Sequence, residues 1–379
     1  MKVLVIGAGI IGSAIARWAA RAGVEVVVLD GAGAASGTTS RGEGNILLSD
    51  KAPGLELDLA RLSRTLWDDL GEDLGRERFE LQDKGGLVVP TSPEATAALD
   101  AFATSQRVAG VQARSVEDVH DLEPYLAPDL ASGMHYPEDA QVQPVLAAHA
   151  LLADARAAGA RVFLGDPVIG GTLSGPGVRT ASGAVHRADA VVNAAGTWGG
   201  AVGRLLGAPV PVLPRRGFIL VTEPCPPMIR HKVYSADYVA NVASSDAGLE
   251  TSCVVESTPG GTILIGASRE RVGFELALRV EVVERLAAQA VRLYPVLAGR
   301  QLLRVYRGFR PYCPDHLPVI GPDPRLPWLL HACGHEGAGI GLATGTAALV
   351  TAYLTGDDPG LVDAFAGLKP NRLLTEEAS

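Results

Sequence analysis

The first thirty residues alternate between short apolar runs and a helical pattern. "KVLVI" (2–6) and "VEVVVLD" (24–30) are rich in β-branched residues and predict strands that are buried on both faces. Between them, "SAIARWAARAG" (13–23) has the apolar spacing of a helix and ends in a glycine. Strand, helix and strand in this order predict a parallel βαβ unit.

Further along the chain, "RADAVVNAAGTWGG" (187–200) predicts another buried strand, which ends in small residues. "RVEVVERLAAQAVRLYP" (279–295) predicts an amphipathic helix that ends before Pro295. "ALVTAYLTG" (348–356) predicts a helix near the C-terminus. The chain enters this helix through "GHEGAGIGLATGTA" (334–347), which has five glycines in fourteen residues. So many glycines indicate either a plain turn or a backbone that passes very close to something that is not protein.

Composition and charge exclude several classes of protein. The 379 residues are 47% apolar and 20% charged, which is typical of a globular chain of about two domains. A net charge of −9 argues against nucleic acid as a partner. No apolar run is long enough to span a bilayer. The four cysteines form no metal-binding pair and suit a reducing compartment, so we expect a cytoplasmic protein without a metal site.

The βαβ unit carries a dinucleotide-binding pattern. Gly7, Gly9 and Gly12 follow the G-x-G-x-x-G spacing between the first strand and the first helix. Asp30, eighteen residues after Gly12, ends the second strand, where a carboxylate can bind both hydroxyls of a ribose. The helix N-terminus would bind the pyrophosphate. Both FAD and NAD fit this pattern.

The continuation favours FAD. After Asp30 the chain has no second βαβ repeat but "GAGAASGTTSRGEGNILLSDK", which is rich in small and hydroxyl residues. Thr38, Thr39 and Ser40 are candidates to bond phosphate or ribitol oxygens, and Gly44 and Asn45 follow before an apolar run.

Five motifs, in order and spacing, resemble the D-amino acid oxidase superfamily of FAD enzymes. They are "VLVIGAGIIGSAIA", "SGTTS", "ADAVVNAAGTW", "GFRPYCPDHLPVIGP" and "GHEGAGIGLATG". Within this superfamily, the motifs most resemble those of glycine oxidase and of the flavoprotein subunits of D-hydroxyproline dehydrogenase, opine oxidase and hydrogen cyanide synthase. The resemblance implies an α/β fold with a Rossmann-like FAD-binding domain and an inserted mixed α+β substrate domain. We assign residues 1–80, 141–212 and 307–379 to the first and residues 81–140 and 213–306 to the second.

The resemblance also implies how FAD is bound. The adenine half would lie on the N-terminal unit, and residues 335–341 would lend backbone N–H groups to the flavin ring. The helix from about Gly341 to Thr355 would direct its positive end at the flavin. The expected cofactor contacts are Gly7, Gly9, Ile10, Ile11, Gly12, Asp30, Thr38, Thr39, Ser40, Gly44, Asn45, Val168, Ala195, Gly196, Trp198, Gly334, His335, Glu336, Gly337, Gly339, Ile340 and Gly341.

"RVYRGFRPYCPDHLP" (304–318) holds the main candidate for substrate binding. By resemblance, Arg310 grips a substrate carboxylate, and its guanidinium suits a bidentate, charge-assisted pair. We expect structural roles for Arg304 and Arg307. Tyr312 either assists Arg310 or packs against it.

Two further residues are catalytic candidates. Glu43 stands beside Asn45 and either attracts a substrate ammonium or forms a salt bridge with Arg41. His335 begins the glycine loop. Glycine oxidase carries a second arginine in this loop where this chain has Gly337, so the substrate site would admit a bulkier or cyclic molecule.

These features predict a FAD-dependent dehydrogenase that oxidises a C–N bond of a D-amino acid, D-hydroxyproline or opine-like substrate, with noncovalent FAD. The chain has no lysine between Lys232 and Lys369, the region of the oxygen-activating lysine of sarcosine oxidases, which favours a dehydrogenase over an oxygen-using oxidase. The alternatives are such an oxidase and a non-catalytic FAD-holding subunit of a hetero-oligomer. We expect a small amino acid or amine as substrate, an oligomer, and an electron-accepting partner subunit.

Overall fold

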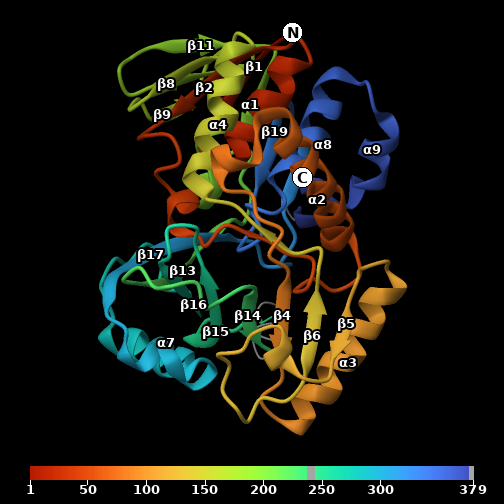
Figure 1. The fold of residues 1–379 in the computed structure, drawn as a ribbon. Helices are drawn as coiled ribbons and strands as arrows, with labels where there is room; N and C mark the ends of the chain where they lie inside the picture. Colours follow the sequence, from red (N-terminus) through yellow and green to blue (C-terminus); the bar gives the residue numbers. More distant parts are fainter. Residues whose placement is uncertain (237–243, 375–379) are drawn as a thin grey trace.

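The computed structural model describes residues 1–236 and 244–374. In Figure 1 the chain forms an upper part, which contains both termini, and a lower part built on a second sheet. The upper part is a six-stranded sheet in the order β18-β19-β12-β1-β2-β8, in which only the β18–β19 pair is antiparallel. Its strands are β1 (Lys2–Ile6), β2 (Glu25–Asp30), β8 (Arg161–Leu164), β12 (Ala190–Asn193), β18 (Val319–Asp323) and β19 (Leu326–Cys333).

Helices α1 and α8 pack on this sheet through apolar faces, and other helices pack on them. Helix α1 contacts both α4 and α8, and α2 packs on α8. The apolar residues of β1 and β2 are buried, as their pattern predicts. The helices of this part are α1 (Ile10–Arg21), α2 (Leu55–Leu74), α4 (Pro144–Ala157), α5 (Gly199–Leu206), α8 (Ala343–Thr355) and α9 (Pro359–Ala364).

The lower part is an eight-stranded mixed sheet in the order β17-β13-β16-β15-β14-β4-β6-β5. Helix α7 (Val280–Leu293) packs on β15 and β16, and α3 (Pro93–Val108) packs on β6. The strands are β4 (Gly86–Val89), β5 (Arg114–Val116), β6 (Gly133–Tyr136), β13 (Leu213–Thr222), β14 (Lys232–Ser235), β15 (Glu250–Ser257), β16 (Ile263–Arg269) and β17 (Leu302–Tyr312).

Two small sheets complete the described fold. One pairs β3 (Asn45–Ile46) with β7 (Ala140–Gln141), and the other joins β9 (Val168–Gly171), β10 (Gly177–Thr180) and β11 (Val185–Arg187). The predicted α/β class with a parallel Rossmann-like core is confirmed. The amphipathic helix expected over 279–295 is α7, and the helix expected from about Gly341 begins two residues later, at Ala343.

Strand β17 connects the two parts. It pairs along its length with β13, with Gly308 opposite Gly217 and Arg310 opposite Arg215, and its last residues lead back to β18. The predicted domain boundary at 306/307 falls inside this strand. We keep the division as a proposal, with β17 shared between the two domains.

Candidate functional site

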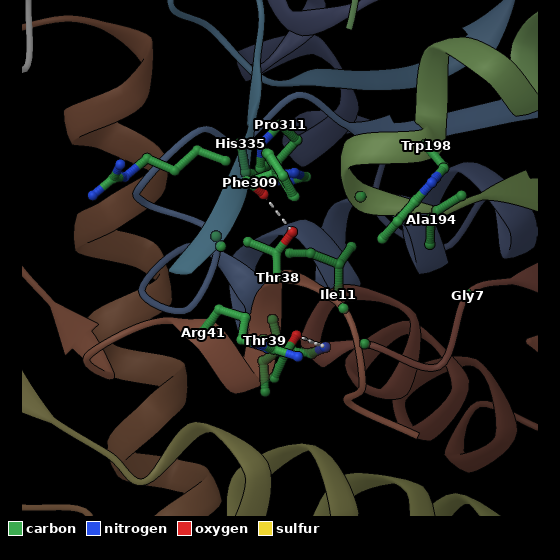
Figure 2. A pocket seen from close by; sticks show the side chains of 18 of the residues that line it. Gly7, Ile11, Thr38, Thr39, Arg41, Ala194, Trp198, Phe309, Pro311 and His335 are labelled. Atoms are coloured by element: carbon green, nitrogen blue, oxygen red, sulfur yellow. Dashed lines mark hydrogen bonds between the residues drawn. The ribbon is translucent and has the colours of Figure 1, made fainter. Parts of the chain in front are cut away.

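A cavity of about 540 Å³ lies between the two parts. Its walls come from the turn between β1 and α1, the segment 36–45, the segment 194–198, strands β13 and β17, and the glycine loop 335–340. Figure 2 shows Gly7, Ile11, Thr39 and Ala194 on one side of it and Phe309, Pro311 and His335 on another. Segments more than three hundred residues apart in the sequence therefore meet at one site.

Most of the residues expected at the site line this cavity. They are Gly7, Gly9, Ile10, Ile11, Asp30, Thr38, Thr39, Glu43, Asn45, Val168, Ala195, Gly196, Trp198, Arg310, His335, Glu336, Gly337, Gly339 and Ile340. Six expected residues stand behind the wall: Gly12, Ser40, Gly44, Tyr312, Gly334 and Gly341.

The glycine turn after β1 is built for close approach. Gly7 has φ +115°, and a β-carbon on it would collide with the Ala194 carbonyl. A β-carbon on Gly9 would lie 3.1 Å from Thr39 Oγ1, and one on Gly12 would collide with the Gly7 carbonyl. Gly7 and Gly12 therefore have no room for a side chain and Gly9 has little, and together they leave a cradle at the start of α1 where a pyrophosphate could lie.

Asp30 holds the edge of this cradle. Its carboxylate accepts hydrogen bonds from the backbone N–H groups of Ala8 (2.7 Å) and Ala32 (2.8 Å). Both amides belong to loops that line or border the cavity, so the acid fixes the local backbone as well as presenting oxygen atoms to the cavity. A ribose bound here would share this carboxylate with the two amides.

The hydroxyl groups after Asp30 bind protein atoms. Thr39 Oγ1 accepts from the Ile10 amide at 3.0 Å, and Thr38 Oγ1 donates to the Phe309 carbonyl at 2.7 Å (Figure 2). Thr197 donates to the same carbonyl at 2.6 Å. Ser40 donates into its own turn, to Gly37 O at 3.2 Å. Thr38 and Thr197 thus connect β17 to the segments 36–45 and 194–198 of the cavity wall.

His335 is a buried, neutral histidine. Its side chain forms a hydrogen bond between Nε2 and Thr346 Oγ1 at 3.0 Å, and burial lowers its pKa to about 3. It therefore carries no charge near neutral pH. Through Thr346 it holds the glycine loop onto the first turns of α8, which is a positioning role.

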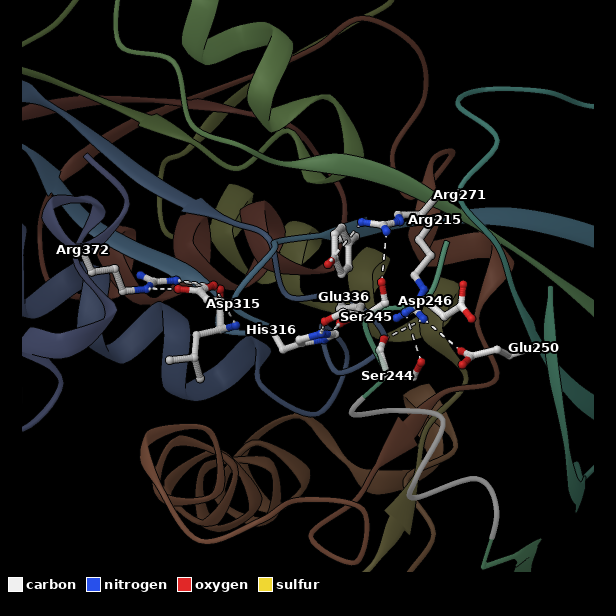
Figure 3. Close-up of polar contacts among 12 residues, drawn as sticks. Arg215, Ser244, Ser245, Asp246, Glu250, Arg271, Asp315, His316, Glu336 and Arg372 are labelled. Atoms are coloured by element: carbon white, nitrogen blue, oxygen red, sulfur yellow. Dashed lines mark hydrogen bonds and ion pairs between the residues drawn. The ribbon is translucent and has the colours of Figure 1, made fainter. Parts of the chain in front are cut away.

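Glu336 fixes the same loop from the other side. Its backbone has φ +48°, and its carboxylate pairs with Arg215 Nη1 at 2.5 Å and with His316 Nδ1 at 3.0 Å. Figure 3 shows this network, in which Arg215 also reaches Ser244 and Glu250. The side chain of Glu336 is thus committed to protein partners, and its contribution to the cavity is its backbone.

The Arg310 side chain crosses from β17 over β13. Its Nη1 donates to the Ser268 carbonyl on β16 at 2.8 Å, and it passes directly over Gly217. Gly337 in the glycine loop lies on its other side, with an added β-carbon 3.6 Å from Arg310 Nε. The guanidinium is therefore held flat against the cavity wall between two glycines.

Tyr312 stands away from the cavity. It is 2% exposed, and the guanidinium groups of Arg215 and Arg271 lie 5.4 and 5.1 Å from the centre of its ring. Of the two roles considered from the sequence, this position favours packing.

Glu43 has a different ion-pair partner from the one expected. The predicted salt bridge with Arg41 is wrong: Glu43 Oε2 lies 3.5 Å from Lys232 Nζ and accepts from Asn45 Nδ2 at 3.1 Å, while Arg41 donates to the Arg307 carbonyl. Glu43 is 6% exposed and lines the cavity. Its second oxygen, Oε1, points at Gly266, where an added β-carbon would collide with it.

Sequence reasoning missed Gly217, Gly266 and Lys232. The two glycines interrupt apolar strands, which is the usual sign of a close approach, and this sign was available in "GFILV" and "ILIGAS". It also missed Phe309, which lines the cavity, and Phe274, whose ring centre lies 5.2 Å from that of Phe309 and 5.6 Å from that of Trp198, an expected cofactor contact.

The cavity fits FAD. The cradle at Gly7, Gly9 and Gly12 suits a pyrophosphate, Asp30 suits a ribose, and the small residues Ala194, Ala195 and Gly196 leave room beside the cradle. Across the described residues, no group of three or more acidic, histidine or cysteine side chains is arranged to hold a metal ion. Within the same residues, the helices are all too short or too polar to cross a bilayer.

Comparison with known proteins agrees with this geometry. The family model for FAD-dependent oxidoreductases of the DAO type matches residues 2–353. Glycine oxidase of Geobacillus kaustophilus is 29% identical over 92% of this chain and 91% of its own, and a crystal structure of glycine oxidase from that organism covers 98% of this chain and 99% of its own with a TM-score of 0.87.

Two further proteins match this chain over different shares of their lengths. Hydrogen cyanide synthase subunit HcnC of Pseudomonas aeruginosa is 31% identical over 59% of this chain, and the match spans about half of that protein, 51%. A crystal structure of L-proline dehydrogenase from P. horikoshii, 23% identical with a TM-score of 0.88, covers 98% of this chain and 97% of its own and shares the fold. The chain therefore belongs to the DAO family of FAD-dependent oxidoreductases, and its cofactor is FAD.

Proposed function

We propose that this enzyme is an amino acid or secondary amine dehydrogenase that oxidises the C–N bond of a D-amino acid, D-hydroxyproline or opine-like substrate. The observation that carries the proposal is the pairing of one cation and one anion, Arg310 and Glu43, on the same wall of the cavity. A zwitterionic substrate needs both.

The spacing of the two groups suits an α-amino acid. Arg310 lies over Gly217 on β13, and Glu43 Oε1 lies over Gly266 on β16. Leu220 on β13 pairs with Ile265 on β16 in an antiparallel register. If this register continues by one residue, Gly266 lies opposite Ile219. Ile219 is two residues from Gly217 and is therefore on the same face of β13. Two residues along a strand span about 7 Å and neighbouring strands lie about 4.8 Å apart, so the two glycine positions are about 8 Å from each other. A carboxylate and an amino group on one carbon, with a hydrogen bond at each end, fit within this span.

The roles of the residues follow from this arrangement. FAD, when bound, supplies the acceptor for the two electrons that leave the carbon beside nitrogen. Arg310 binds the carboxylate and so fixes which face of that carbon is presented. Glu43 attracts the ammonium group. Phe309 and Trp198 line the cavity and Phe274 packs on both, so we expect these rings to limit the entry of water.

The proposal of a dehydrogenase rests on the absence of a cavity lysine. Among the described residues that line the cavity, none is a lysine, and Lys232 lies behind Glu43 and Asn45 with its ammonium directed to them. The alternative is an oxidase that uses oxygen, as the name of the related glycine oxidase states. A non-catalytic subunit is a weaker alternative, because such a subunit would not need Arg310 and Glu43 together.

We also propose that FAD is bound noncovalently and that the enzyme works in the cytoplasm as an oligomer with an electron-accepting partner. All four cysteines are buried free thiols, and none of them lines the cavity. The word "subunit" in the name of the HcnC relatives supports a partner, but the match spans only about half of those chains.

The test is anaerobic mixing of the purified protein with a panel of D- and L-amino acids, prolines, opines and N-methyl amino acids. The proposal expects at least one of them to bleach the flavin absorbance, and the same compound without its carboxylate to do so at least tenfold more slowly. Bleaching by none of the amines, but by hydroxy acids or polyols, would reject it.

A further inference from the structure

Behind Glu43 lies a buried cluster of three ionisable side chains, Glu43, Lys232 and Glu256. Lys232 begins β14 and Glu256 is in β15. Lys232 Nζ lies 2.9 Å from Glu256 Oε2 and 3.5 Å from Glu43 Oε2, and it donates to Asn45 Oδ1. One ammonium therefore bridges two carboxylates, only one of which reaches the cavity.

The cluster is shut off from solvent. Glu43 is 6% exposed, Lys232 2% and Glu256 0%. Glu43 Oε1 and Glu256 Oε1 are buried atoms that accept no hydrogen bond from any described residue. An unpartnered carboxylate oxygen in such surroundings is costly unless it receives a proton or a donor from a bound molecule.

The ionisable groups around the cluster do not donate to these two carboxylate oxygens. Lys84 Nζ donates to Gln141 Oε1 at 2.9 Å, and the Tyr306 hydroxyl donates to Gly42 O at 3.3 Å. Burial lowers the pKa of Lys84 and raises the pKa of Tyr306. Burial also raises the pKa of Cys253, and Arg41 and Arg304 act on the Tyr306 hydroxyl from further away. Tyrosine and cysteine therefore stay neutral, and the two glutamates are the groups that can take up a proton.

We propose that this cluster receives the proton that a substrate ammonium must lose before its C–N bond can be oxidised. Glu43 Oε1 takes the proton from nitrogen. The carboxylic acid group of Glu43 then turns about its Cγ–Cδ bond so that its proton faces Lys232, whose Nζ lies 3.5 Å from Oε2. Lys232 donates one of its protons to Glu256 as it receives this one, so Glu43 is again a carboxylate, Lys232 again an ammonium, and Glu256 a carboxylic acid. The neutral amine could then lose a hydride from the carbon beside nitrogen, which the flavin, when bound, would accept. The nitrogen lone pair would form the C=N bond of an iminium ion.

Electrostatics supports this order of events. Two carboxylates that share one buried ammonium cannot both stay ionised cheaply, so one of them has a raised proton affinity. Burial raises the pKa of Glu256, with Lys232 acting in the opposite direction. Glu43 is thus the catalytic group that touches the substrate, while Lys232 and Glu256 are positioning residues that act through it. This inference rests on the proposed amine oxidation.

The first experiment measures the rate constant of anaerobic flavin bleaching from pH 6 to 9 by rapid mixing, at saturating substrate. The unaltered enzyme should show a rate that changes little with pH. In Glu256→Gln and Lys232→Met the cluster can no longer hold the proton. The rate should then be proportional to the fraction of substrate whose amine is already neutral, and it should fall about tenfold per pH unit below the amine pKa. Glu117→Gln, an exposed glutamate, is the matched control.

The second experiment uses a ligand that cannot react, 2-aminoisobutyrate, which has no hydrogen on the carbon beside nitrogen. Its Kd is measured by titration of the flavin absorbance at pH 6, 7.5 and 9. Glu256→Gln should bind it as tightly as the unaltered enzyme, because Glu43 keeps its charge. Glu43→Gln should bind it about tenfold more weakly for each unit that the pH falls below the amine pKa. A variant that had lost its structure would lose both ligand binding and flavin bleaching. Tight binding together with a slow, pH-dependent rate therefore excludes that explanation.

A third measurement needs no substrate and keeps the two proposals apart. The pKa of Glu256 is raised in the folded protein, so its contribution to stability is lost as pH rises from the ordinary glutamate pKa through the folded one. Glu256→Gln should therefore gain more in Tm at pH 8 than at pH 5. The proposed proton transfer to Glu256 would be overturned by an equal change in Tm at the two pH values. It would also be overturned if the bleaching rate of Glu256→Gln had the same pH profile as that of the unaltered enzyme. Failure of every amine to bleach the unaltered enzyme would instead overturn the proposed function.

Discussion

The guanidinium of Arg310 lies directly over the α-carbon of Gly217. The two residues belong to neighbouring antiparallel strands, β17 and β13, and Arg310 Nη1 continues past Gly217 to the Ser268 carbonyl, 2.8 Å away. A β-carbon at 217 would collide with Arg310 Nη1 and lie 2.6 Å from Ser268 O. The direction of the arginine therefore depends on a residue that has no side chain.

Gly217→Ala should displace the Arg310 guanidinium while the fold and the cofactor stay in place. Crowding of this kind costs about 1–3 kcal/mol, and each 1.4 kcal/mol in transition-state binding is about tenfold in rate. We expect kcat/KM to fall by about 10- to 100-fold with FAD content unchanged. Gly299→Ala is the control, because nothing lies within 4 Å of its added β-carbon. Equal kinetics in the two variants would show that Arg310 need not lie over residue 217.

Arg310→Ala tests the carboxylate contact itself. Removing one partner of a buried ion pair costs about 3–5 kcal/mol, so kcat/KM for the carboxylate substrate should fall by about 100-fold or more. Arg310→Lys should recover part of it, because an ammonium lacks the bidentate fork. A decarboxylated amine should react equally with all three proteins. If the flavin is lost from Arg310→Ala, or the kinetics stay the same, the carboxylate is held elsewhere.

The part of the cavity where we propose that the nucleotide binds could be predicted because it is local. Gly7, Gly9, Gly12 and Asp30 lie within one βαβ unit, and the contact of Asp30 with the Ala8 amide spans only 22 residues. Their spacing fixes their geometry. The same holds for α7, whose apolar face was plain in the sequence.

The substrate side could not be predicted in the same way. Lys232 and Asn45 are 187 residues apart, and they meet because β14 enters the eight-stranded sheet between β4 and β15. No local pattern specifies that order of strands. The expected Glu43–Arg41 pair failed for this reason: Arg41 is near in sequence, but the fold brings Lys232 to Glu43.

The Asp30 carboxylate should govern FAD affinity. Hydrogen bonds to a charged group contribute about 1.5–3 kcal/mol, so Asp30→Ala should raise the Kd of FAD by about 10- to 100-fold. Asp30→Asn keeps one acceptor oxygen and should lose less. The measurement is titration of the apoprotein with FAD, followed by quenching of flavin fluorescence. Unchanged affinity in Asp30→Ala would mean that this carboxylate serves only the Ala8 and Ala32 amides.

Acid precipitation should release all the flavin into the supernatant. The four cysteines are buried and none of them lines the cavity, so none is in place for a thioether link to the cofactor. Absorbance of the supernatant and of the redissolved pellet measures the two fractions. Yellow colour that stays in the pellet would establish a covalent link.

The reduced enzyme should react with an artificial acceptor dye at least tenfold faster than with oxygen. The reason is that no described residue lining the cavity is a lysine, and Lys232, behind Glu43, gives its ammonium to Glu43, Asn45 and Glu256. Reoxidation of the flavin in air-saturated buffer, with and without dye, measures both rates. Hydrogen peroxide formed as fast as substrate disappears would instead favour the oxidase alternative.

His335 should make the protein less stable in mild acid. Burial lowers its pKa to about 3, whereas an unfolded histidine titrates near 6.5. Because the folded pKa is the lower one, the contribution to stability is complete above about pH 6.5 and is lost as the pH falls from there toward 3. At pH 5 the loss is about 2 kcal/mol, since each pH unit below the unfolded pKa costs about 1.4 kcal/mol.

His335→Gln retains a donor for Thr346 Oγ1 but cannot be protonated. Urea unfolding at pH 7.5 and pH 5 should therefore show a smaller decrease in the free energy of unfolding for His335→Gln than for the unaltered protein, by about 2 kcal/mol. An equal decrease in both proteins would mean that His335 is protonated in the folded state, and it would then stand as a cation beside the flavin-binding loop.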